Sequence, residues 1–79
     1  MAKKNAPAIV KVTHTEMICW SIRFQEAQRD EFVQKAARAQ AADKFEIESW
    51  CREEVNRIDA IIEVLQQMYM TETGVEYNG

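Results

Sequence analysis

The residues of this chain with the greatest capacity for chemistry are one histidine and two cysteines, His14, Cys19 and Cys51. A histidine can activate a neighbouring thiol as a nucleophile, and a cluster of such side chains can hold a metal ion. His14 and Cys19 are five residues apart, which places them on different faces of a helix, and no third group is placed to orient the histidine. We therefore expect no catalytic, cofactor-binding or metal-binding residues, and we expect both cysteines to act as small hydrophobic side chains.

Charged residues are distributed unevenly along the chain. Basic residues occur in the N-terminal segment and near the middle of the sequence, at Lys3, Lys4, Lys11, Lys35, Arg38 and Lys44. Acids intersperse with these bases and the sequence pI is near 5.1, so we do not expect a nucleic-acid partner. Residues 43–73 contain eight acids and three bases. This acidic segment is either a solvated helix face or an imitation of a polyanion.

The segment from Arg52 to Leu65 resembles the first helix of the all-helical chorismate mutases, which has an arginine followed by an Ile-Asp-x-Ile-Asp pattern and a run of Leu and Ile. The resemblance implies an enzyme that neutralises a dicarboxylate substrate with several cations. It covers less than a quarter of the chain, and Tyr69 stands where the second arginine of that helix would be. Electrostatic catalysis needs several converging cations. We therefore assign no catalytic residue from this resemblance, and we expect a non-enzymatic protein.

Residues 14 to about 42 predict a first helix, because they contain neither glycine nor proline. Thr13 and Glu16 form a capping box at its start. One face of this helix, which we expect to pack against the rest of the protein, is formed by Met17, Trp20, Phe24 and Ala27. Ile18 and Ile22 extend this face sideways, whereas Phe32, Val33 and Ala36 fall on a rotated face. The apolar pattern therefore changes phase near residues 29–31, which indicates either a kink or a change from one contact surface to another.

Residues 44 to about 73 predict a second helix, with Asp43 as its N-cap and Glu46 at N3. Asp43 also fits inside one continuous helix. Apolar residues of this segment recur at alternating spacings of four and three, which is the heptad pattern of a packing seam. The seam consists of Cys51, Val55, Ile58, Ile62, Leu65 and Tyr69, and it is flanked by Trp50, Ile61, Val64 and Met68. We expect Gly74 to end the helix in a Schellman motif, in which Met70 and Val75 touch.

If the chain reverses at residues 42–43, a residue of the first helix lies level with the residue of the second helix for which the two numbers add to about 85. Phe24 then lies level with Ile61, and apolar side chains of both helices meet along the pair. We therefore predict an all-α fold, an antiparallel two-helix hairpin of residues 14–42 and 44–73 in a single domain over residues 1–79. Cys19 and Cys51 lie at different levels of this hairpin, so we expect no disulfide between them.

The two ends of the chain are predicted to lie outside the hairpin. Residues 1–13 form a basic arm, in which the β-branched residues 8–12 have the composition of a short extended strand, and residues 74–79 form a tail. The chain contains no apolar run long enough to cross a membrane, and its N-terminus lacks the apolar core of a signal peptide. We expect a cytoplasmic protein.

A chain of 79 residues buries only about 60% of its unfolded surface, so its fold needs additional support. The apolar surface of the second helix is wider than one neighbouring helix can cover, which predicts a protein partner. The predicted partner-binding residues are Trp50, Cys51, Val55, Ile58, Ile61, Ile62, Val64, Leu65, Met68 and Tyr69. We expect a helical hairpin that self-associates or serves as a subunit of a larger assembly. The alternative is a small inhibitor or adaptor that docks on a host enzyme or complex.

Overall fold

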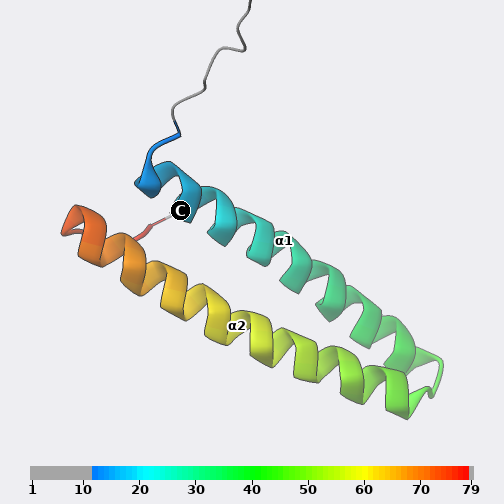
Figure 1. Ribbon diagram of the computed structural model, residues 1–79. Helices are drawn as coiled ribbons and strands as arrows, with labels where there is room; N and C mark the ends of the chain where they lie inside the picture. Colours follow the sequence, from blue (N-terminus) through cyan, green and yellow to red (C-terminus); the bar gives the residue numbers. More distant parts are fainter. Residues whose placement is uncertain (1–11, 79) are drawn as a thin grey trace, which may run out of the picture.

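The computed structural model describes residues 12–78, which form two long helices, α1 (His14–Ala41) and α2 (Phe45–Thr73). The helices run in opposite directions side by side and are joined by a short turn, as Figure 1 shows. This arrangement confirms the predicted all-α hairpin, and the helix boundaries lie within one residue of the predicted ones. Residues 12–78 contain no strand, and the segment predicted as a strand, 8–12, lies outside the described residues apart from Val12.

The predicted capping box at the start of α1 is confirmed. The backbone N–H of Glu16 donates to the hydroxyl of Thr13 at 3.1 Å, and the backbone N–H of Thr13 donates to the Glu16 carboxylate at 3.0 Å. The Thr13 N–H, together with the Thr13 hydroxyl 3.1 Å from the same carboxylate oxygen, holds the pKa of Glu16 below its ordinary value. This contribution to stability is therefore present above the ordinary glutamate pKa and is lost as the pH falls through the lowered one. The Thr13 hydroxyl itself contributes about 1 kcal/mol in such caps.

The turn between the helices corrects the prediction for Asp43. Asp43 is not the N-cap of α2. Lys44 takes that position, and its side chain makes no capping hydrogen bond. Asp43 instead has a φ of 57°, in the left-handed region. Its N–H donates to the carbonyl of Gln40 at 3.1 Å, and the N–H of Lys44 donates to the carbonyl of Ala39 at 2.8 Å. This pattern is a Schellman motif that ends α1, with Asp43 where glycine is most common.

Replacing Asp43 with glycine should stabilise the hairpin. A side chain in left-handed backbone is strained, and aspartate is only better tolerated there than most residues. We expect Asp43→Gly to raise the free energy of unfolding by about 0.5–1 kcal/mol, after allowance for the greater freedom of glycine in the unfolded chain. Thermal denaturation followed by circular dichroism measures the change. Ala42→Gly is the matched control: Ala42 has a φ of −95°, so its replacement should only destabilise. A lower melting temperature for Asp43→Gly would contradict the Schellman assignment.

The end of α2 is at Thr73, and Gly74 follows with a φ of 77°, as predicted. The N–H of Gly74 donates to the carbonyl of Met70 at 2.7 Å. The N–H of Val75 donates to the Thr73 hydroxyl at 3.2 Å rather than to a helix carbonyl. The helix therefore ends in the simpler left-handed motif with one backbone hydrogen bond, and not in the predicted Schellman motif.

The core lies in a single seam between the helices. Its buried apolar side chains within residues 12–78 are Ile18, Ile22, Ala36 and Ala39 of α1 and Cys51 and Ile58 of α2. The seam predicted for α2 is confirmed, because Cys51 and Ile58 are buried and the other four members are half-buried. Both cysteines are free, as predicted.

The face of α1 that packs against α2 is not the predicted one. Met17, Trp20, Phe24 and Ala27 are exposed, and Phe24 retains 61% of its accessible surface. The inner face of α1 follows its own heptad series, with alternating spacings of four and three, formed by Ile18, Ile22, Gln25, Arg29, Phe32, Ala36 and Ala39. This series runs in one phase through a continuous helix, so there is no break at residues 29–31.

The predicted level of the two helices agrees with the contacts between them. His14 lies beside Glu72 at the open end, with Nδ1 and Oε2 3.3 Å apart. Arg29 and Asp59 form an ion pair across the middle, at 2.5 Å. Phe32 meets Trp50 near the turn. The structure therefore keeps the predicted pairing of levels while α1 is rotated about its axis, which turns a different set of side chains outward.

Candidate protein interface

The ten residues predicted to bind a partner fall into three groups in the structure. Cys51 and Ile58 are buried against α1. Five are half-buried along the seam, namely Val55, Ile61, Ile62, Leu65 and Tyr69. Three are exposed, namely Trp50, Val64 and Met68. Among these ten, only the flank of the seam is therefore open to contact in a single hairpin, and the role of all ten in partner binding stays a prediction.

The exposed flank of α2 lies on one side of its seam. Trp50 and Met68 are eighteen residues apart, which is five full helical turns, so they point in the same direction. In the heptad, Trp50 and Val64 occupy c positions, and Ile61 and Met68 occupy g positions. On α1, Met17 and Phe24 also occupy c positions, each directly before a seam residue.

The c and g positions of both helices lie on the same face of the hairpin, because g positions face g positions in an antiparallel pair. Two contacts across the helices agree with this geometry. The rings of Phe32 and Trp50 pack edge to face, with centroids 5.4 Å apart. At the open end, His14 of α1 lines one shallow pocket together with Val64 and Met68 of α2.

We call this side of the hairpin the apolar face, formed by Met17, Phe24, Trp50, Ile61, Val64 and Met68, with Trp20 at its edge. Sequence reasoning found its α2 half but assigned its α1 half to the core. The heptad series that begins at Ile18 and Ile22 could have placed Met17 and Phe24 outside the core, because neither residue belongs to it. Across residues 12–78, eleven large hydrophobic side chains are exposed and six apolar residues are buried, so the molecule offers more apolar contact than its own core uses.

The opposite side of the hairpin, which we call the polar face, consists of the e and b positions. Arg29 pairs with Asp59 here, and this hydrogen bond raises the pKa of the guanidinium above its ordinary value. Arg52 pairs with Glu48 at 2.7 Å. Exposed ion pairs of this kind contribute little to stability.

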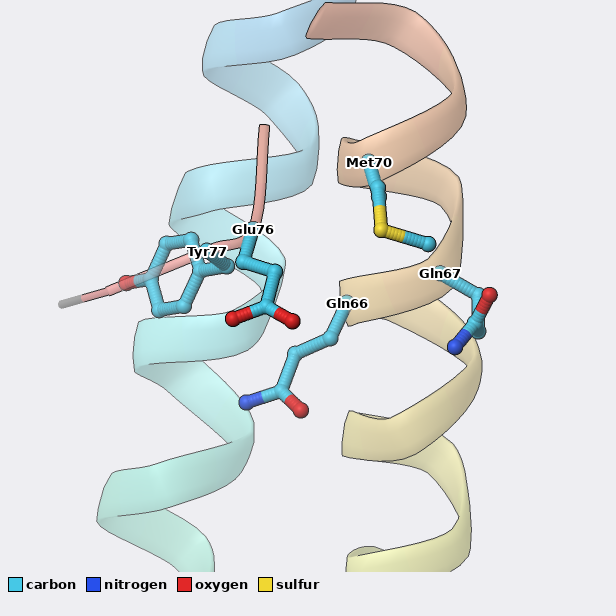
Figure 2. A pocket seen from close by; sticks show the side chains of 5 residues that line it. All are labelled: Gln66, Gln67, Met70, Glu76 and Tyr77. Atoms are coloured by element: carbon cyan, nitrogen blue, oxygen red, sulfur yellow. The ribbon is translucent and has the colours of Figure 1, made fainter. Parts of the chain in front are cut away.

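The C-terminal tail lies against the polar face at the open end. After Gly74 the chain turns back from α2 toward α1 (Figure 1). Figure 2 shows Glu76 and Tyr77 of the tail beside Gln66 and Met70, with which they line a shallow pocket. The ring of Tyr77 packs edge to face on Tyr69, with centroids 5.3 Å apart. The tail therefore covers the seam from the polar side, and the apolar side at the same level stays uncovered.

The acidic side chains of α2 are partly neutralised within the hairpin. Arg52 pairs with Glu48, Arg57 with Glu54 and Arg29 with Asp59. His14 lies beside Glu72. The His14 pair is charged only when the imidazole is protonated. Four of the seven acids of α2 are thus engaged, which weakens the view that α2 imitates a polyanion.

Within residues 12–78, no three side chains of the metal-binding types come together. In the same part of the chain, neither helix has an apolar stretch of the length and hydropathy required to cross a membrane. Comparison with protein-family models, curated proteins and solved structures finds no significant match.

Proposed function

We propose that this chain is a non-enzymatic protein-interaction module that associates with further copies of itself. The observation that carries the proposal is the apolar face, where large hydrophobic side chains remain exposed on both helices; Val64, for example, retains 59% of its accessible surface. Methionine and aromatic residues are the types enriched at the cores of protein interfaces. Self-association would also add to the stability of a hairpin with so small a core.

The second candidate is an inhibitor or adaptor that docks on a different protein. The same apolar face supports it, because an exposed patch indicates a contact without naming the partner. The pairing of four acids within the hairpin leaves less charge for polyanion mimicry. Any such docking would therefore rest on the hydrophobic side chains rather than on acidic α2.

Sedimentation equilibrium of the purified full-length chain over a wide concentration range tests the proposal. We expect the average mass to rise with concentration above the 9.2 kDa of one chain. The apolar content of the face should make this association insensitive to added salt. A helical chain that stays at the monomer mass up to about millimolar concentration, where even weak complexes form, would overturn self-association and favour the adaptor.

A further inference from the structure

We infer that the chain forms a closed two-fold dimer, a four-helix bundle in which the apolar faces of two hairpins pack together and the polar faces stay in solvent. This inference rests on the proposed self-association and specifies its surface and its stoichiometry. A two-fold interface uses the same patch on both copies and is then complete, whereas an open assembly needs two complementary patches on different sides of the molecule.

The faces differ in charge as well as in hydrophobicity. The c and g positions of the two helices carry two acids and three bases, namely Glu31, Glu54, Lys35, Arg38 and Arg57. The e and b positions carry five acids and two bases, namely Glu16, Glu26, Asp30, Asp59, Glu63, Arg23 and Arg52. The chain has a net charge of −3, yet its apolar face is close to neutral. Two apolar faces can therefore meet without repulsion, whereas two polar faces would repel each other.

The charged groups of the apolar face are engaged by neighbouring side chains or lie at its outer edge. The ammonium group of Lys35 lies 5.3 Å from the centre of the Phe32 ring, and Arg57 pairs with Glu54. Side chains of this kind place their methylene groups on apolar surface and keep their charged ends in water. Arg57 occupies a c position, at the outer edge of the face, and would lie at the rim of a stacked pair. Lys35 and Glu54 occupy g positions beside the seam, where Lys35 lies over the Phe32 ring and Glu54 pairs with Arg57.

The exposed surface is close to what a stable dimer buries. A large side chain that is half exposed offers about 100 Å² to a partner, because buried aromatic residues cover about 150–250 Å² each. Met17, Trp20, Phe24, Trp50, Val64 and Met68 together then offer on the order of 500 Å² per copy. Half-buried Ile61 and Phe32 and the methylene groups of the rim add to this. The total approaches the roughly 800 Å² per partner of a stable interface.

The polar face offers no equivalent second patch. At the open end it is occupied by the tail through Tyr77, and along its length it carries the Arg29 and Arg52 ion pairs. Its large exposed apolar side chains on the helices are Val33, Phe45 and Met70. They form no continuous patch, because Phe45 is the first residue of α2 at the turn, whereas Met70 lies at the open end. Because only one face carries a continuous apolar patch, association stops at two copies.

Paired charge variants of exposed residues test the inference. Phe24→Glu and Met68→Glu place carboxylates on the apolar face, whereas Val33→Glu and Ala37→Glu place them on the polar face. Val33 is a matched control, since it is apolar, lies on α1 and is 43% exposed. We expect wild type and both polar-face variants to reach a plateau at twice 9.2 kDa. The apolar-face variants should bind at least a hundredfold more weakly, with helical circular dichroism retained in all four.

The outcomes separate this inference from the proposal on which it rests. A wild-type chain that stays monomeric overturns self-association itself. A mass that rises well beyond the dimer overturns only the closed two-fold arrangement. Loss of association in the Val33 and Ala37 variants but not in the Phe24 and Met68 variants overturns the choice of face. If one variant of a pair fails to fold, as judged by circular dichroism, the other variant of that pair decides.

Discussion

Ile58→Asp should leave the chain unfolded under conditions in which the wild type is helical. Ile58 is 5% exposed and lies in the middle of the α2 seam, facing α1. A carboxylate placed there without a partner costs several kcal/mol, even after the group becomes protonated to avoid carrying its charge. A core of this size supplies only about 3–5 kcal/mol of stability, so one such change is enough to remove the fold. Far-ultraviolet circular dichroism would show the loss of helix directly.

Val64→Asp is the control for this prediction. It introduces the same carboxylate into the same helix six residues later, but at an exposed position of the apolar face. We expect the Val64 variant to keep its helical spectrum as a monomer, whereas self-association is lost. A folded Ile58→Asp variant with a wild-type melting temperature would show that Ile58 faces solvent and that the seam is misplaced.

The sequence predicts α2 well because its seam contains no polar residue from Cys51 to Tyr69. Apolar residues at alternating spacings of four and three over that distance indicate one packing seam, and the structure places this seam against α1. The capping box at Thr13 and the left-handed glycine at Gly74 are equally direct, because each depends on residue types with few other uses.

The packing face of α1 is hidden from the sequence for a physical reason. Two polar residues, Gln25 and Arg29, occupy the middle of its heptad series and are half-buried there. Arg29 is accommodated because it reaches the edge of the interface and pairs with Asp59. Two alanines complete the series near the turn and carry little hydrophobic signal. The larger side chains of Met17 and Phe24 therefore dominate the pattern although they lie outside the core.

The turn is ambiguous for a different reason. Aspartate is favoured both as a helix N-cap and in left-handed backbone, so its presence before a helix fits either role. At residue 43 the choice depends on where α1 stops. Ala39, which is buried and accepts the hydrogen bond from Lys44, belongs to the end of α1, and no local pattern reveals this.

The rotation of α1 predicts different effects on stability for two residues that are two positions apart, Ile22 and Phe24. Ile22 is completely buried, so Ile22→Ala should lower the free energy of unfolding by about 2–4 kcal/mol through lost contacts and a cavity. Phe24 has the larger side chain and belongs to the face that the sequence placed inside. Because it is exposed, Phe24→Ala should change the stability of the single hairpin by no more than about 0.5 kcal/mol. Urea denaturation of both variants measures the difference.

Protein concentration separates the two effects, because association adds to apparent stability by mass action. The loss in Ile22→Ala should be present at every concentration, since it arises within one hairpin. The loss in Phe24→Ala should be small in dilute solution and grow as the wild type associates. If Phe24→Ala were instead the more damaging change in dilute solution, α1 would pack through Met17, Trp20 and Phe24, and the apolar face would be part of the core.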